Sequence, residues 1–146
     1  MRTNLLYYIV FSITFVLFCT SCGDEQPRII PNTPVNIYGE LALPEFAPLR
    51  FEGNAIVVKG FGYQNNGVIV YRINSMVNAF DCTCPNCMME RSQANAVQLD
   101  GLSTGTATCP VCGVQYALLN GWAEGVKYPL QSYTASISND VLHVHN

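Results

Sequence analysis

Apolar and polar residues alternate over short distances through most of this chain, which is the pattern of β-strands that bury one face. The apolar positions are rich in β-branched and aromatic residues, and Asn, Asp and Gly stand in the breaks at 64–67, 99–101, 119–121 and 138–140. The segments expected to be strands are residues 35–43, 55–60, 67–73, 76–80, 95–100, 105–109, 114–119, 132–138 and 141–145.

Helical periodicity is weak throughout the chain. The best candidate, residues 88–96, predicts a helix of at most one or two turns. A length of 146 residues is that of a single domain. The sequence therefore predicts an all-β protein, an antiparallel β barrel or sandwich of about eight or nine strands.

The N-terminus has a composition of its own. Arg2 precedes an apolar run over residues 5–18, which is too short to be a good membrane span, and the small residues Thr20 and Ser21 follow it. This order is typical of a secretory signal peptide that is cleaved before Cys22. An uncleaved anchor and a simple signal with an incidental cysteine are the alternatives.

A signal that ends in small residues and then Cys resembles that of bacterial lipoproteins, although Cys19 stands where that motif usually has Leu. The resemblance implies a signal peptide at 1–21, lipidation of Cys22, a flexible tether over 22–33 and a folded domain over 34–146. It also implies that the protein is lipid-anchored in the cell envelope, and we expect the outer membrane.

The charge of the chain bears on one class of partner, nucleic acid. The chain has 7 basic and 10 acidic residues and a net charge of −3, so nothing in it predicts binding to nucleic acid.

Two Cys-x-x-Cys pairs carry the candidate chemistry: Cys84 with Cys87, and Cys109 with Cys112, each after a predicted strand and with 21 residues between the pairs. Each pair can turn both sulfurs toward one point, and two pairs complete a tetrahedron around a metal ion. Proline follows the first Cys of each pair, and Gly113 allows the positive φ that closes the second turn.

Two other interpretations of the same thiols stay open. An exported protein can form disulfides, and five cysteines after residue 22 do not decide between disulfides and metal. A thioredoxin-like dithiol needs its first Cys at a helix N-terminus in a βαβ unit, and the sequence predicts neither.

Residues 80–146 resemble the Rieske iron-sulfur domains, all-β proteins with one cluster-binding loop reading C-T-H-x-x-C and a second reading C-P-x-H or C-P-C-H-G-S. Here the loops read CTCPNC (82–87) and CPVCG (109–113), and YPLQSYTASISNDVLHV (128–144) follows the pattern of the tail. Cys84 and Cys112 stand in place of the two histidines, which excludes a His₂Cys₂ cluster. Val111 stands where the family has the second cysteine of its loop-bridging disulfide.

Two ligand sets are compatible with these loops. Placement as in a Rieske domain would use Cys82 in place of Cys87, whereas matched Cys-x-x-Cys spacing favours Cys84, Cys87, Cys109 and Cys112, with Cys82 left as a spare thiol. The two histidines, His143 and His145, alternate with apolar residues on the last strand and are expected on its solvated face, outside this site.

Four thiolates suit Zn²⁺, a mononuclear iron or a [2Fe-2S] cluster. Arg2 is not part of a twin-Arg pair, so we expect export of the unfolded chain and capture of Zn²⁺ outside the cytoplasm. No catalytic motif is present, and Asp81 and Glu90 are interpreted as turn and surface residues.

The sequence therefore predicts a non-enzymatic binding or assembly module with a structural zinc-type site and an unknown protein partner. A [2Fe-2S] electron-transfer protein is the alternative, and a thiol-disulfide redox protein is the second alternative.

Overall fold

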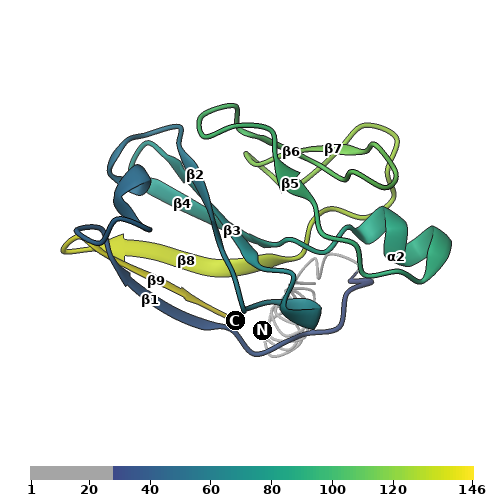
Figure 1. The fold of residues 1–146 in the computed structure, drawn as a ribbon, viewed down its shortest axis with the longest axis horizontal. Helices are drawn as coiled ribbons and strands as arrows, with labels where there is room; N and C mark the ends of the chain where they lie inside the picture. Colours follow the sequence, from purple (N-terminus) through teal and green to yellow (C-terminus); the bar gives the residue numbers. More distant parts are fainter. Residues whose placement is uncertain (1–27) are drawn as a thin grey trace, which may run out of the picture.

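The computed structural model describes residues 28–146, so the predicted signal peptide and Cys22 lie outside the described residues. Nine strands form two antiparallel sheets (Figure 1). The larger sheet contains β1 (Asn36–Glu40), β2 (Ala55–Val58), β3 (Val68–Ile73), β4 (Met76–Asp81), β8 (Ser132–Ser138) and β9 (Val141–His145). The smaller contains β5 (Gln98–Leu99), β6 (Thr106–Thr108) and β7 (Gln115–Ala117). The predicted all-β fold is confirmed, and all nine predicted segments contain a strand.

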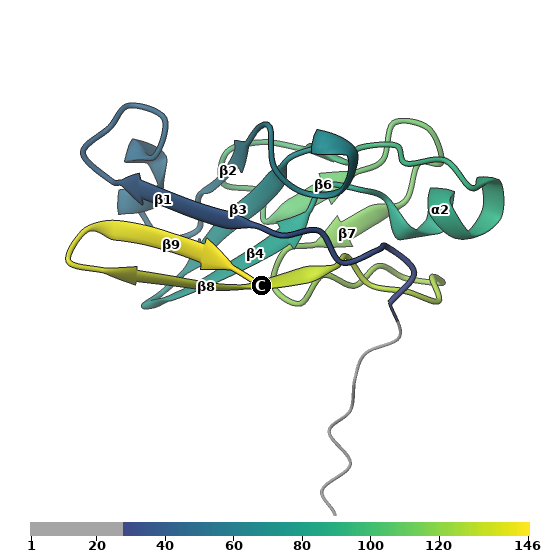
Figure 2. The same ribbon diagram turned by 90° about the horizontal axis from the view of Figure 1, so that it is seen from below.

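The order of strands in the larger sheet is β1-β9-β8-β4-β3-β2. Two residues, Asn139 and Asp140, connect β8 to β9, and they adopt φ of 50° and 60°, which Asn and Asp tolerate better than most residues. Figure 2 shows this turn at one end of the molecule and the small sheet toward the other, beside the helix α2 (Pro85–Arg91).

Two clusters of buried side chains follow from the alternation of the strands. One lies on the inner face of the larger sheet and includes Ile37, Leu142 and Val144. The other joins β3 and β4 to the small sheet, and Cys82, Cys84, Cys87 and Cys109 are part of it. The cysteine loops are thus packed into the second core.

The short helix was predicted too far along the chain. It starts at Pro85 and ends at Arg91, and the residue that follows, Ser92, is its C-cap with a φ of 54°. Proline is preorganised for the first helical position, so the helix begins inside the first cysteine pair. The expectation that no cysteine of these pairs stands at a helix N-terminus is wrong, since Cys84 is the N-cap of α2. Two 3₁₀ helices, η1 (Ala47–Arg50) and η2 (Tyr63–Asn65), were not predicted.

Contacts with the domain begin within the segment expected to be a tether. Ile30 is buried, and the side-chain amide of Asn146 donates hydrogen bonds to the Oδ1 atom of Asn32 and the carbonyl of Thr33. Among residues 28–146, no helix has the length and apolar character that crossing a bilayer requires.

Candidate metal centre

The two cysteine pairs lie on loops that start where strands end. β4 ends at Asp81, and the first loop leads through Cys84 into α2, whose first turn carries Cys87. β6 ends at Thr108, and the second loop carries Cys109 and Cys112. The backbone N–H of Gly113 donates a hydrogen bond to the carbonyl of Cys109, and its φ of 75° confirms the predicted need for glycine here.

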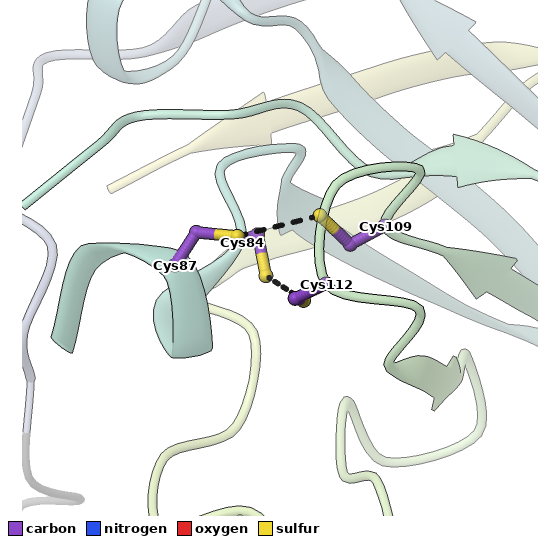
Figure 3. Close-up of side chains that lie close together, drawn as sticks. All are labelled: Cys84, Cys87, Cys109 and Cys112. Atoms are coloured by element: carbon purple, nitrogen blue, oxygen red, sulfur yellow. Dashed lines mark hydrogen bonds between the residues drawn. The ribbon is translucent and has the colours of Figure 1, made fainter. Parts of the chain in front are cut away.

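The four predicted thiols come together across the two loops. Their sulfur atoms all lie within 4.8 Å of one another. The Sγ atoms of Cys84 and Cys112 are 3.6 Å apart, and so are those of Cys87 and Cys109, as the dashed lines of Figure 3 indicate. Each close pair joins one loop to the other, so the cluster ties together segments far apart in sequence.

The spacing of the sulfurs can be compared with that of a tetrahedral site for one ion. A Zn–S bond of about 2.3 Å places the sulfurs at the corners of a tetrahedron with edges of about 3.8 Å. The two 3.6 Å separations are close to that value, and the other separations are at most 4.8 Å. The donor set, four sulfurs and no oxygen, suits Zn²⁺ or iron rather than Mg²⁺ or Ca²⁺.

Cys82 lies outside this group of four. It is buried, and a Cβ atom built on Gly67, just before β3, would be 3.4 Å from its sulfur. The Cys82 backbone N–H donates to the carbonyl of Gly67, which holds the start of the loop against that segment. Burial and the nearby charge of Asp81 raise the pKa of Cys82 to about 12.

Burial also affects the pKa values of the thiols in the cluster. It raises the pKa of Cys84 well above its usual range and that of Cys87 to about 11. Burial opposes the ionisation of Cys112 as well, but hydrogen bonds from the Val114 backbone N–H and from the other cluster thiols outweigh it and lower its pKa to about 7. Cys112 is also the one partly exposed member of the cluster, so its thiolate is the most accessible.

Asp81 is not the turn residue that the sequence indicated. Its side chain is fully buried, and its carboxylate accepts hydrogen bonds from the backbone N–H groups of Tyr63 and Thr83 and from the hydroxyl of Tyr133. These bonds hold the first loop against β8 and η2, since Thr83 stands directly before Cys84. Glu90 is exposed on α2, as expected.

Tyr116 is a site residue that the motif analysis did not single out. It is fully buried on β7, and its hydroxyl oxygen lies 3.6 Å from the sulfur of Cys84. Burial and this contact raise its pKa above the usual range, so the hydroxyl keeps its proton and can donate it to a thiolate. Its position within a strand directly after the second loop was the available signal.

The two histidines lie where the sequence placed them. Leu142 and Val144 of β9 are fully buried, whereas His143 and His145 point to the opposite, outer face and are not part of the cysteine cluster. Within the larger sheet, β8 separates β9 from β4 and its cysteine loop.

Two antiparallel sheets with paired loops opening after β4 and β6 define a Rieske-type fold. The structure resembles the plasma-membrane Rieske protein PetC3 of Synechocystis at a TM-score of 0.51 and 19% identity, over 77% of this chain and 99% of that one. It also resembles a quaternary ammonium Rieske monooxygenase, CntA, at a TM-score of 0.53 and 13% identity, over 78% of this chain and 33% of that one.

At these identities the likeness shows the fold, and the Rieske-like fold expected from the loop motifs is confirmed. No family model matches the sequence, and none of the curated proteins matches it significantly. The domain thus has a Rieske-like fold, and its two loops carry four cysteines that could hold a metal or an iron-sulfur cluster.

Proposed function

We propose that the protein is a membrane-tethered lipoprotein whose Rieske-like domain holds one zinc ion through Cys84, Cys87, Cys109 and Cys112. The ion has a structural role, and the domain acts as a non-enzymatic binding or assembly module for a protein partner at the cell envelope. The observation that carries the proposal is the gathering of four sulfurs, two from each loop, within 4.8 Å of one another.

The span of the sulfurs favours a single ion. In a [2Fe-2S] cluster two irons stand between the thiolate pairs, so sulfurs on opposite irons are farther apart than sulfurs on one iron. Here every sulfur of the four cysteines lies within 4.8 Å of the other three, and a group this small has room for one central ion. Four thiolates also occupy all four coordination positions of a tetrahedral zinc ion. No position is left for a substrate, which supports a structural role.

Two exposed apolar side chains, one in the second loop and one after β7, are considered as contacts for a partner. Val111, between the two cysteines of that loop, is 44% exposed, and Trp122 after β7 is 37% exposed. Tryptophan is enriched among the residues that contribute most to protein-protein binding, so Trp122 is the side chain that supports a partner. Attachment through lipid on Cys22, in the outer membrane, rests on the signal sequence.

A [2Fe-2S] electron-transfer protein is the second candidate, favoured by the shared fold of Rieske proteins. With no imidazole in the cluster, its potential would lie near that of plant-type ferredoxins and below that of Rieske centres. A thiol-disulfide protein is a third candidate. The position of Cys84 at the N-cap of α2 favours it, whereas the raised pKa of this buried thiol opposes it.

One experiment separates these candidates. Residues 27–146 are produced without air, and the absorbance spectrum, metal content and acid-labile sulfide are measured. We expect one zinc per chain, no visible bands and no sulfide. Two irons with two sulfides would establish the electron-transfer candidate, one iron without sulfide would exclude zinc, and a metal-free oxidised domain would favour the disulfide candidate.

Lipidation is tested separately. In a bacterial host supplied with a labelled fatty acid, the full chain should take up the label, and Cys22→Ala should abolish the uptake. Cys19→Ala is the matched control and should leave it unchanged. Label on Cys22→Ala but not on Cys19→Ala would contradict the assignment.

A further inference from the structure

The outer face of β9 carries the two imidazoles of this protein side by side. His143 and His145 are two positions apart on one strand, so both project from the same face, opposite the core residues Leu142 and Val144. Their ring centroids are 4.7 Å apart with an interplanar angle of 33°. Both side chains are partly exposed, so solvent and ions can reach them.

We propose that His143 and His145 bind one divalent transition-metal ion in a second site, separate from the cysteine cluster. Two imidazoles at positions i and i+2 of a strand can supply two nitrogen ligands to one ion after small rotations of the exposed rings. Imidazole suits Zn²⁺, Cu²⁺ and Ni²⁺. Water and oxygen donors would fill the other positions.

The residues around the pair favour a cation. In the register of the sheet, Asn36 and Thr134 flank His145, and Tyr38 and Ser136 flank His143. All four carry neutral oxygen atoms. Strands β1, β8 and β9 contain no lysine or arginine, so none of their side chains opposes a cation on this face.

One ring is already oriented by its neighbours. The ring of Tyr38 stacks on that of His143, with 4.1 Å between the ring centroids. The Nε2 atom of His143 lies 3.2 Å from the Oδ1 atom of Asn36. An amide oxygen only accepts, so Nε2–H is the donor, and in the neutral imidazole the lone pair then lies on Nδ1. Metal-bound histidines commonly donate their other N–H to such an acceptor. Asn36 is therefore a positioning residue for this site.

The test uses the full chain in detergent micelles, with its resident metal in the cysteine cluster and no affinity tag, and Ni²⁺ as the probe. Calorimetric titration should show one Ni²⁺ per chain in addition to the resident metal. His143→Asn and His145→Asn should each weaken binding at least tenfold, and Asn36→Ala should weaken it about tenfold. Ser132→Ala, at an exposed position of β8 outside the pair, is the matched control and should bind as the unaltered chain does.

A second readout uses the sequence itself. The chain has two histidines, so its imidazole NMR signals come from His143 and His145 alone. Bound paramagnetic Ni²⁺ should broaden both sets of signals. Equal Ni²⁺ affinity in the unaltered chain and both histidine variants, or sharp imidazole signals at saturating Ni²⁺, would overturn the proposal and leave the rings as a stabilising stack.

Discussion

The hydroxyl of Tyr133 donates a 2.7 Å hydrogen bond to the fully buried carboxylate of Asp81, joining β8 to the strand end from which the first cysteine loop starts. Tyr133→Phe removes one donor to a buried acceptor, and we expect a loss of about 1–3 kcal/mol in the free energy of unfolding. Asp81→Ala should cost more, since it leaves the N–H groups of Tyr63 and Thr83 unpaired as well.

Denaturant unfolding of the metal-loaded domain measures both losses. Glu90→Gln, which removes a carboxylate from the exposed face of α2, is the control and should change the free energy by less than about 0.5 kcal/mol. Equal stability of the Asp81→Ala and Glu90→Gln variants would mean that the buried carboxylate does not support the loop.

The ligand set gives a matched pair of variants within one loop. Cys87→Ser removes a sulfur of the cluster and should abolish stoichiometric metal binding. Cys82→Ser changes a buried thiol outside the cluster and should retain one metal per chain. Metal content after dialysis is the measurement, and loss of metal from Cys82→Ser but not from Cys87→Ser would contradict the assignment.

Tyr116→Phe removes the hydroxyl that lies 3.6 Å from the sulfur of Cys84. Groups that hydrogen-bond to metal ligands commonly contribute about 10–100-fold to affinity. We therefore expect the variant to give up its metal to a chelator at about tenfold lower chelator concentration, with the fold retained. An unchanged chelator titration would show that the hydroxyl does not stabilise the bound thiolate.

Metal binding should weaken as the pH falls. Thiols bind as thiolates, and the raised pKa values of Cys84 and Cys87 mean that both carry protons at neutral pH and must release them on binding. Cys112, with its pKa lowered to about 7, releases its proton on binding only below that pH. The number of protons released per metal should therefore fall by one as the pH rises through about 7.

Calorimetry in buffers of different ionisation enthalpy counts these protons at pH 6 and pH 8. Cys112→Ser should remove the difference between the two pH values, whatever metal affinity it retains. Equal proton release by the unaltered domain at both values would contradict a lowered pKa for Cys112.

Much of the fold could be predicted because strand signals are local. Alternation and turn residues placed all nine strands, and the Asn139-Asp140 turn is a case in which two residues specify a connection. The gathering of the four thiols was predictable for a similar reason. Each pair is a local motif, and both pairs follow strands.

The remaining features depend on contacts between distant residues. The burial of Asp81 is set by Tyr133, which is 52 positions away, and no local pattern shows that contact. The start of α2 at Pro85 was missed because the cysteine motif and the helix overlap. The hydroxyl of Tyr116 reaches Cys84 across 32 positions, through the pairing of the small sheet.

The uneven exposure of the cysteine cluster affects how the ion is acquired. Cys84, Cys87 and Cys109 are closed off from solvent, and Cys112 alone is partly open. Among the four sulfurs, that of Cys112 is therefore the one that an ion or a chelator in solution meets first. We therefore expect metal exchange, and modification of the thiols in the metal-free domain, to begin at Cys112.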